Sequence, residues 1–230
     1  MQRFSTQGIV LARTNYGEAD RIITFLTPDR GKVKGFAKGV RRSKSKLAGG
    51  IELFSVSELS LIIGKSEINT IISTRLLKHY GNIVKNLDRT NLGYEFIKIT
   101  NKATEDHPEQ AYFDLLRNSF NSLDHKTIDV GLVEIWFKAQ LLKLSGHTPN
   151  LRTDKSGKKL EADKLYDFNF DEVGLILSEN GEFGTDQIKF LRLIFSDNQP
   201  SALQKVKQSP QLAGQCQQLV GTLLQNYVRL

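Results

Sequence analysis

Five short runs of β-branched and aromatic residues fill the first third of the chain, and they constrain its fold more than any other feature. The runs are GIVLART, RIITFLT, KVKGFAKGV, FSVSELSLII and INTIIST, with residues typical of turns between them. One of these turns, Thr27-Pro28-Asp29-Arg30-Gly31, combines a proline that fixes φ with a glycine that accepts positive φ. Five strands in fewer than 80 residues predict a small closed barrel of the OB or SH3 type.

From about residue 80 the apolar residues recur at helical spacing. The most regular helix is predicted from Asp129 to Ser145, where Trp136 belongs to an apolar stripe that we assign to the core. Glycines, a proline and strand-like pieces interrupt the helical pattern between residues 148 and 183. We therefore predict an α+β multidomain chain: a barrel domain at residues 1–78, then an α-helical domain at residues 79–230 with an irregular insert at about 148–183.

The positive charge of the chain is concentrated in the segment RGKVKGFAKGVRRSKSK, residues 30–46, which we call the basic segment. It contains eight basic residues and no acidic one, and the formal net charge of the whole chain is +7. The remaining residues include 24 basic and 25 acidic ones, so the excess is local. A local excess favours a phosphate-binding surface, and the alternative is a solvated charge run on a mobile loop.

Strand alternation predicts how the basic segment is oriented. Lys32, Lys34 and Lys38 have the same parity and are expected on one face, with Val33 and Ala37 on the other.

Phe36 shares the parity of these lysines and is expected to be exposed, although phenylalanines in barrels usually pack in the core. We also expect Gly35 and Gly39 to let a polymer backbone approach closely. Cations that follow a backbone beside aromatic rings are typical of single-stranded nucleic-acid binding. The candidate binding residues lie in the first inter-strand loop, the third strand and the loop after it: Arg13, Tyr16, Arg21, Lys32, Lys34, Lys38, Arg41, Arg42, Lys44 and Lys46.

Signals for other classes of protein are weak. The four histidines are scattered without metal-ligand spacing, and the single cysteine, Cys216, excludes an internal disulfide and an all-cysteine zinc site. No nucleophile elbow or dinucleotide fingerprint occurs, so an enzyme is unsupported. The N-terminus lacks a signal-peptide pattern and no window approaches the roughly 18 apolar residues of a membrane span. We expect a soluble cytoplasmic protein without cofactors.

The first third of the chain resembles the N-terminal domain of the RecO family of bacterial DNA repair proteins. The resemblance covers GIVLARTNYGEADRIITFLTPDRGKVKGFAKGVRRSKSKLAGGIELFSVSELSLIIGKS, with a GEADRI loop, a TP-x-x-GK turn and an F-A-K-G-x-R-R-x-K-S core. A second stretch, EIWFKAQLLKLSGHTPNL, is similar to the helix of that family that leads to a G-x-x-P-x-L turn.

The resemblance implies an OB-fold followed by a helical domain, in a non-enzymatic recombination mediator associated with the nucleoid. Such a protein binds single- and double-stranded DNA, anneals complementary strands and assists recombinase loading on protein-coated single strands. The partners implied are RecR and the acidic C-terminal tail of the single-stranded-DNA-binding protein. The residues that carry over position by position are Lys34, Lys38, Arg41, Arg42, Lys44 and Lys46, and Tyr16 and Arg21 lie in the matching first loop.

The insert departs from the zinc-binding pattern of many family members. Thr153 and Ser156 stand where the resemblance places the first pair of cysteines, and hydroxyl groups are poor zinc ligands. We therefore expect a zinc-finger-like insert without metal, stabilised by packing of Tyr166, Phe168, Phe170 and Ile176.

Three alternatives to a DNA-binding mediator remain open from the residues. The first is an RNA-binding OB-fold protein of translation or RNA processing, since phosphate contacts dominate affinity for both polymers. The second is an enzyme with an OB recognition domain, and the third is a scaffold whose basic loop binds an acidic partner. For the acidic tail we expect an apolar pocket edged by Lys138, Lys143 and Arg152.

Overall fold

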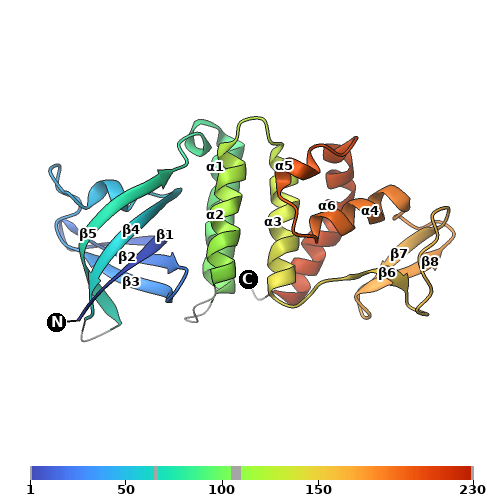
Figure 1. Cartoon of the computed structure of the whole chain (residues 1–230), viewed down its shortest axis with the longest axis horizontal. Helices are drawn as coiled ribbons and strands as arrows, with labels where there is room; N and C mark the ends of the chain where they lie inside the picture. The colour runs from blue at the N-terminus through green and yellow to red at the C-terminus, as the bar shows by residue number, and fades with distance from the viewer. Residues whose placement is uncertain (1, 65–66, 105–109, 229–230) are drawn as a thin grey trace. The chain divides into compact units, whose positions relative to one another are not determined.

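A computed structural model of the protein describes residues 2–64, 67–104 and 110–228. These residues divide into two compact units, Met1–Lys126 and Thr127–Leu230. Five strands and two long helices belong to the first unit, and four helices and three short strands to the second (Figure 1). In the described part of the chain, every helix is too short or too polar to cross a membrane.

The predicted closed barrel is confirmed, with the strand order β1-β2-β3-β5-β4. The long first strand pairs with β4 through its first half and with β2 through its second half, and a bulge lies between Val10 and Ala12. The barrel is completed by a parallel pairing of β3 with β5, which gives it an OB-like arrangement. The strands are β1 (Arg3–Tyr16), β2 (Asp20–Thr27), β3 (Gly31–Ala37), β4 (Ser55–Ile62) and β5 (Ile68–His79).

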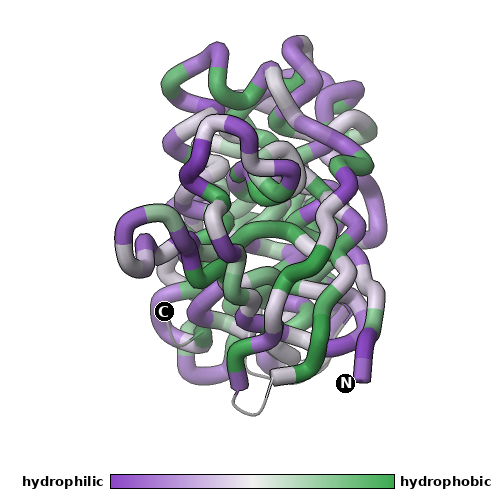
Figure 2. The backbone as a smooth tube through the Cα atoms, turned by 90° about the vertical axis from the view of Figure 1, so that its left-hand side faces the viewer, coloured by the Kyte–Doolittle hydropathy of each residue, from purple (hydrophilic) through white to green (hydrophobic). Residues whose placement is uncertain are grey.

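Alternate residues of the strands build the barrel core. Figure 2 shows apolar (green) and polar (purple) stretches following one another along the backbone. In β3, buried residues alternate with half-buried or exposed ones, as a strand with one buried face requires. Phe25 and Leu59 are fully buried at the centre of the core. The whole buried cluster comprises Val10, Ile23, Phe25, Val33, Ala37, Val40, Ile51, Leu59, Leu61 and Ile71.

Two helices pack on the barrel, α1 (Leu87–Ala103) and α2 (Gln110–Asp124). The ring of Phe54, just before β4, contacts Phe120 of α2 at a centroid distance of 5.5 Å. A Cβ atom at Gly93 of α1 would lie 2.6 Å from the ring of Phe54, so glycine allows this close approach. The compact unit therefore extends beyond the predicted barrel domain of residues 1–78.

In the second unit, α3 (Val130–Leu144) confirms the helix predicted from Asp129 to Ser145. The Asp129 carboxylate caps it by accepting a hydrogen bond from the Leu132 amide, and Gly146 follows its end with φ +82°. Trp136 is 3% exposed, which confirms its assignment to the core. The other helices of this unit are α4 (Thr185–Ile194), α5 (Pro200–Leu203) and α6 (Ser209–Tyr227).

The insert is more regular than predicted. It forms a three-stranded sheet in the order β6-β8-β7, from β6 (Asn150–Asp154), β7 (Leu165–Asn169) and β8 (Gly174–Ser178). The predicted packing is correct for the buried Tyr166 and holds only in part for Phe170, whose ring contacts that of Phe168 at a centroid distance of 5.1 Å but is 37% exposed. Phe168 and Ile176 are half-buried, while the residues that join Tyr166 in the interior are Leu151, Leu175 and Phe183.

Candidate nucleic-acid interface

The strand β3 presents the first lysines of the basic segment on the outside of the barrel. Val33 and Ala37 belong to the barrel core, whereas Lys34 is exposed and Lys32 is half-buried, which confirms the predicted alternation. The strand ends at Ala37, so the exposure of Lys38 follows from the turn after the strand and not from strand parity.

Gly35 allows close packing inside the barrel. This corrects our expectation that its missing side chain lets a polymer backbone approach. A Cβ atom at Gly35 would lie 2.7 Å from the side chain of Ile71 and 3.4 Å from that of Leu61, both core residues. Its missing side chain lets β3 close onto β5. Gly39 has φ +65°, so its glycine identity is explained by the turn that it occupies.

Residues 38–46, here the basic loop, form hydrogen-bonded turns that are tied to the turn between β1 and β2. The Gly39 amide donates to Asp20 Oδ1 at 2.6 Å, and the Arg41 amide donates to the carbonyl of Ala19 at 2.9 Å. The Arg41 guanidinium also reaches the carbonyl of Gly17 at 3.5 Å. The GEADRI loop therefore holds the start of the basic loop, a role that no local sequence signal assigned to Asp20.

The cations of the candidate set differ in their partners. Arg13 pairs with Glu52 at 3.4 Å and Lys34 with Glu67 at 3.5 Å, while Lys32 donates to a backbone carbonyl of α1 at 3.1 Å. Among the described residues, no carboxylate lies within ion-pair distance of the exposed side chains of Lys38, Arg41, Arg42, Lys44 and Lys46. These five side chains therefore remain available to bind anionic groups.

Strand register divides the candidates of the first hairpin between two faces. Arg13 pairs with Ile23, and Arg21 pairs with Ala37. Both partners are core residues, and paired residues point to the same side of a sheet. The two arginines therefore lie on the inner face, at the end of the hairpin that extends past the core. The guanidinium of Arg21 donates to Asn15 on the same face at 3.1 Å.

Tyr16 lies on the other side, the outer face. Register places Thr14, Ile22, Phe36 and Thr70 in one row across four strands, with Tyr16 two residues beyond Thr14. Phe36 is absent from the core cluster and its ring contacts that of Tyr16. The structure thus brings Tyr16, Phe36, Lys32 and Lys34 together on the outer face.

Asn69 is a polar residue beside Lys34 that no local sequence signal singled out. It pairs with Gly35 across the parallel β3–β5 contact, and its side chain donates to the carbonyl of Lys34 at 3.2 Å. Together with Lys32, Lys34 and Glu67, it lines a hollow of about 610 Å³.

The three residues expected to edge a tail-binding pocket lie in the second unit. Lys138 pairs with Glu134 at 2.5 Å and Lys143 with Asp197 at 2.6 Å, whereas Arg152 is exposed on β6. The hydrogen bond from Lys143 holds the pKa of Asp197 below its usual value.

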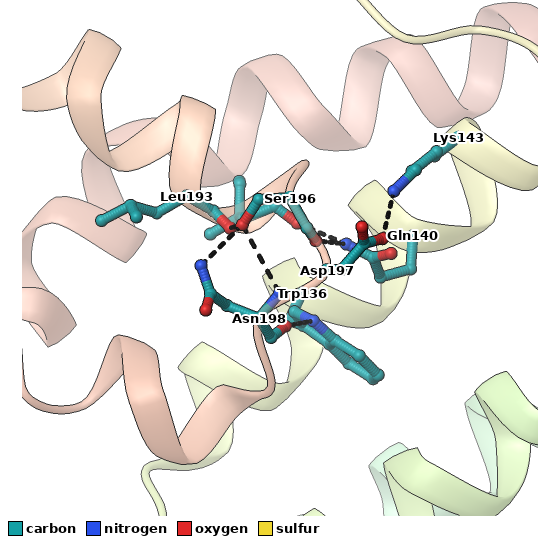
Figure 3. A network of polar contacts seen from close by, with 8 residues as sticks. Trp136, Gln140, Lys143, Leu193, Ser196, Asp197 and Asn198 are labelled. Carbon is teal, nitrogen blue, oxygen red and sulfur yellow. Dashed lines mark hydrogen bonds and ion pairs between the residues drawn. The ribbon is translucent and has the colours of Figure 1, made fainter.

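The same helix is bound to the loop after α4 by further polar contacts (Figure 3). Trp136 donates through Nε1 to the carbonyl of Asn198 at 2.6 Å, and Gln140 donates to the carbonyls of Ile194 and Ser196 at 2.6 and 2.8 Å. These bonds align one side of α3 with the segment that carries Asp197.

Neither of the two large pKa shifts marks a reactive site. Burial raises the pKa of the Cys216 thiol to about 12, and it also raises the pKa of Tyr80 to about 12. A thiol with so high a pKa is a poor nucleophile, and both residues are fully buried. Within residues 2–64, 67–104 and 110–228, no three His, Cys, Asp or Glu side chains gather as a metal site.

Comparisons with known proteins agree with these features. A family model described as recombination protein O N terminal matches residues 1–80, and one described as recombination protein O C terminal matches residues 95–230. The chain belongs to the RecO family. Its relatives carry the name DNA repair protein RecO, and no catalytic activity is named for them.

Three RecO relatives illustrate the degree of similarity. The RecO protein of Dehalococcoides mccartyi strain 195 is 34% identical over 206 residues, which cover 86% of this chain and 80% of the relative. That of strain CBDB1 is 34% identical over 212 residues, covering 89% and 82%. The RecO protein of Rubrobacter xylanophilus is 30% identical over 151 residues, covering 66% and 60%.

Proposed function

We propose that this RecO family DNA repair protein is a non-enzymatic recombination mediator that binds single- and double-stranded DNA and anneals complementary strands. The observation that carries the proposal is the row of exposed cations in the basic loop without carboxylate partners among the described residues. Cations that neutralise phosphates lower the repulsion between two strands, so annealing follows without a bond-making residue. We assign DNA binding to the barrel of residues 1–78. Residues 79–230 form the helical part of the chain, of which residues 79–126 belong to the same compact unit as the barrel.

A salt titration of single-stranded DNA binding tests the proposal. If about six phosphates are engaged, the logarithm of affinity falls with the logarithm of salt concentration at a slope of about −4. The variant Lys38/Arg41/Arg42/Lys44→Ala is expected to bind more weakly, with a shallower slope, and to lose annealing in parallel.

The matched control removes the same charge from the insert. Lys155, Lys158, Lys159 and Lys164 are all exposed, and their replacement by alanine is expected to leave the slope unchanged. If both variants show the same affinity and the same salt slope, the basic loop is a solvated charge run and does not bind DNA. A parallel titration with RNA of the same length tests the RNA-binding alternative, which predicts tighter binding of RNA.

We further propose that the second unit binds the acidic tail of the single-stranded-DNA-binding protein, and that RecR is a second partner in recombinase loading. The ion pair of Lys143 with Asp197 supports an acidic ligand, because a tail carboxylate can replace that of Asp197, which is almost fully exposed. Tail-peptide binding is expected to be lost in Lys138/Lys143/Arg152→Glu, and unchanged binding would remove these residues from the site.

We propose that the insert is a zinc-finger-like module that keeps its shape without metal. Asp154 Oδ1 accepts hydrogen bonds from the Ser156 amide, the Ser156 hydroxyl and the Lys158 amide at 2.8–2.9 Å, so a carboxylate supports the turn where relatives would use thiolates. Metal analysis of the purified protein is expected to find no stoichiometric zinc. For its place in the cell we propose the cytoplasm, in association with the nucleoid, which imaging of a fluorescent fusion tests.

A further inference from the structure

Two aromatic rings lie outside the core on the face of the barrel that carries the lysines. Tyr16, the last residue of β1, is 57% exposed, and Phe36 of β3 is half-buried. Their ring centroids are 5.7 Å apart with an interplanar angle of 84°, an edge-to-face contact. The exposed ring of Tyr16 contributes little to the barrel core, because Tyr16 belongs neither to the core cluster nor to the residues packed against that cluster.

The contact with Phe36 restricts the orientation of the Tyr16 ring. An edge-to-face pair leaves ring surface of the more exposed partner uncovered. The uncovered surface is apolar and flat, which suits a planar, polarisable group more than it suits water. The hairpin backbone also supports this position, because Tyr16 pairs with Asp20, whose carboxylate is bonded to the basic loop.

Lysines flank the rings along β3 and the basic loop, and the carboxylates nearby are those of Asp20, opposite Tyr16, and Glu67, paired with Lys34. Lys34 is two residues from Phe36 on the same face of β3, and Lys38 is two residues beyond it at the start of the basic loop. A nucleic-acid strand presents an anionic backbone on one side and planar bases on the other. Rings that adjoin a line of cations match both sides of such a strand.

We propose that Tyr16 and Phe36 form a stacking platform for an unpaired base of a DNA strand whose phosphates contact Lys34 and Lys38. The inference rests on the proposed DNA binding and adds a site for the base. Bases in a duplex are already stacked on their neighbours, so the platform selects single strands over duplexes. Stacking is tolerant of base identity because every base has a π-face.

Oligonucleotides with and without bases separate stacking from phosphate binding. A short oligothymidylate and an abasic strand of the same length present the same phosphates, and only the first can stack. We expect Tyr16→Ala to weaken oligothymidylate binding roughly 5- to 150-fold and to leave abasic and duplex binding unchanged. The slope of affinity against salt stays the same because no phosphate contact is lost. Tyr16→Phe and Tyr16→Trp retain the binding of wild type.

Tyr94 provides a matched control on α1. It is 49% exposed and makes a similar edge contact with Phe54, with centroids 5.2 Å apart. Tyr94→Ala therefore removes an exposed tyrosine from an equivalent aromatic pair, and we expect it to leave the preference for oligothymidylate over the abasic strand unchanged.

The outcomes distinguish the platform from DNA binding itself. If wild type binds both strands and Tyr16→Ala keeps the preference for oligothymidylate, the platform is overturned and DNA binding stands. An equal loss on both strands also overturns the platform. If wild type binds neither strand, the proposed function fails. A titration with oligouridylate distinguishes the polymer: tighter binding of RNA, lost in Tyr16→Ala, would overturn the assignment to DNA.

Discussion

Replacing Asp20 tests whether the turn between β1 and β2 holds the basic loop for DNA. The Asp20 carboxylate accepts the Gly39 amide hydrogen at a donor–acceptor distance of 2.6 Å, and Gly39 has φ +65°. Asp20→Ala removes this acceptor. Asp20→Asn keeps an oxygen acceptor in its amide and removes the same negative charge, so the two variants separate the hydrogen bond from the charge.

The expected magnitude follows from the exposure of the bond. The bond that distinguishes the two variants is the one to the neutral amide oxygen of Asp20→Asn. Such a bond contributes about 0.5–1.5 kcal/mol, and because position 20 is half-exposed we take about 1 kcal/mol. Without the bond, the basic loop has to be ordered when DNA binds, and this ordering costs about the same free energy. We therefore expect Asp20→Ala to bind single-stranded DNA about fivefold more weakly than Asp20→Asn. The charge effect is common to both variants and cancels in this ratio.

Glu18 supplies the control for this comparison. It lines the same hollow of about 560 Å³ as Asp20, Lys38 and Arg42, and it makes no hydrogen bond to the loop among the described residues. Glu18→Ala and Glu18→Gln are therefore expected to bind DNA equally. Fluorescence anisotropy measures the affinities, and amide exchange of Gly39, faster in Asp20→Ala, reports the lost bond. Equal DNA affinity of Asp20→Ala and Asp20→Asn would refute the reasoning.

Three further variants test individual contacts. Glu67→Gln frees Lys34 from an exposed ion pair and is expected to raise DNA affinity by about twofold in the same titration. Unchanged affinity would mean that Glu67 does not compete with a phosphate for Lys34. Tyr80→Phe removes a buried hydroxyl that has no hydrogen-bond partner among the described residues. Because burial raises the pKa of Tyr80 to about 12, the wild-type protein loses stability between about pH 10 and 12, and the variant loses less. Urea unfolding at alkaline pH measures this difference. Gly35→Ala places a methyl group 2.7 Å from a core isoleucine and is expected to cost about 1–3 kcal/mol in thermal unfolding, whereas Gly49→Ala, with open space around it, costs less.

The sign of the Tyr80 prediction follows from proton binding. The folded protein keeps the phenol protonated to a higher pH than the unfolded chain does, because its pKa is about 12 against an ordinary value of 10.0. Between these values the folded state binds more protons, so the free energy of unfolding falls as pH rises. Equal pH dependence of wild type and Tyr80→Phe would assign the alkaline loss to other groups.

The barrel strands and the exposed face of β3 were predictable because their signals are local. Two-residue alternation places Lys34 outside and Val33 inside whatever the partner strand is, and Pro28 and Gly31 mark a turn by their own backbone preferences. The helix α3 was predictable for the same reason, since its stripe, its cap at Asp129 and the glycine after it lie within one stretch of chain.

The insert was harder to predict because its sheet depends on pairing between distant segments. The short strand β6 runs parallel to β8, and an irregularity lies between the two paired positions. A parallel pairing leaves no hairpin turn in the sequence from which it can be recognised. The separate strand-like pieces were therefore visible, but their assembly into a sheet and the burial of Leu175 and Phe183 were not.

The same distinction applies to the candidate site. Charge, turn chemistry and strand alternation are properties of neighbouring residues. The sequence alone therefore predicts a basic segment on a barrel and the face on which its lysines lie. Asp20 and Gly39 are 19 residues apart, and the edge-to-face pair of Tyr16 and Phe36 joins two strands that are not neighbours in the barrel. Such contacts exist only after the strands have paired in one register, because a shift of one residue would exchange the inner and outer faces. Packing therefore decided that Gly35 faces the core, that Arg13 and Arg21 lie apart from Tyr16, and that the basic loop is held at its start.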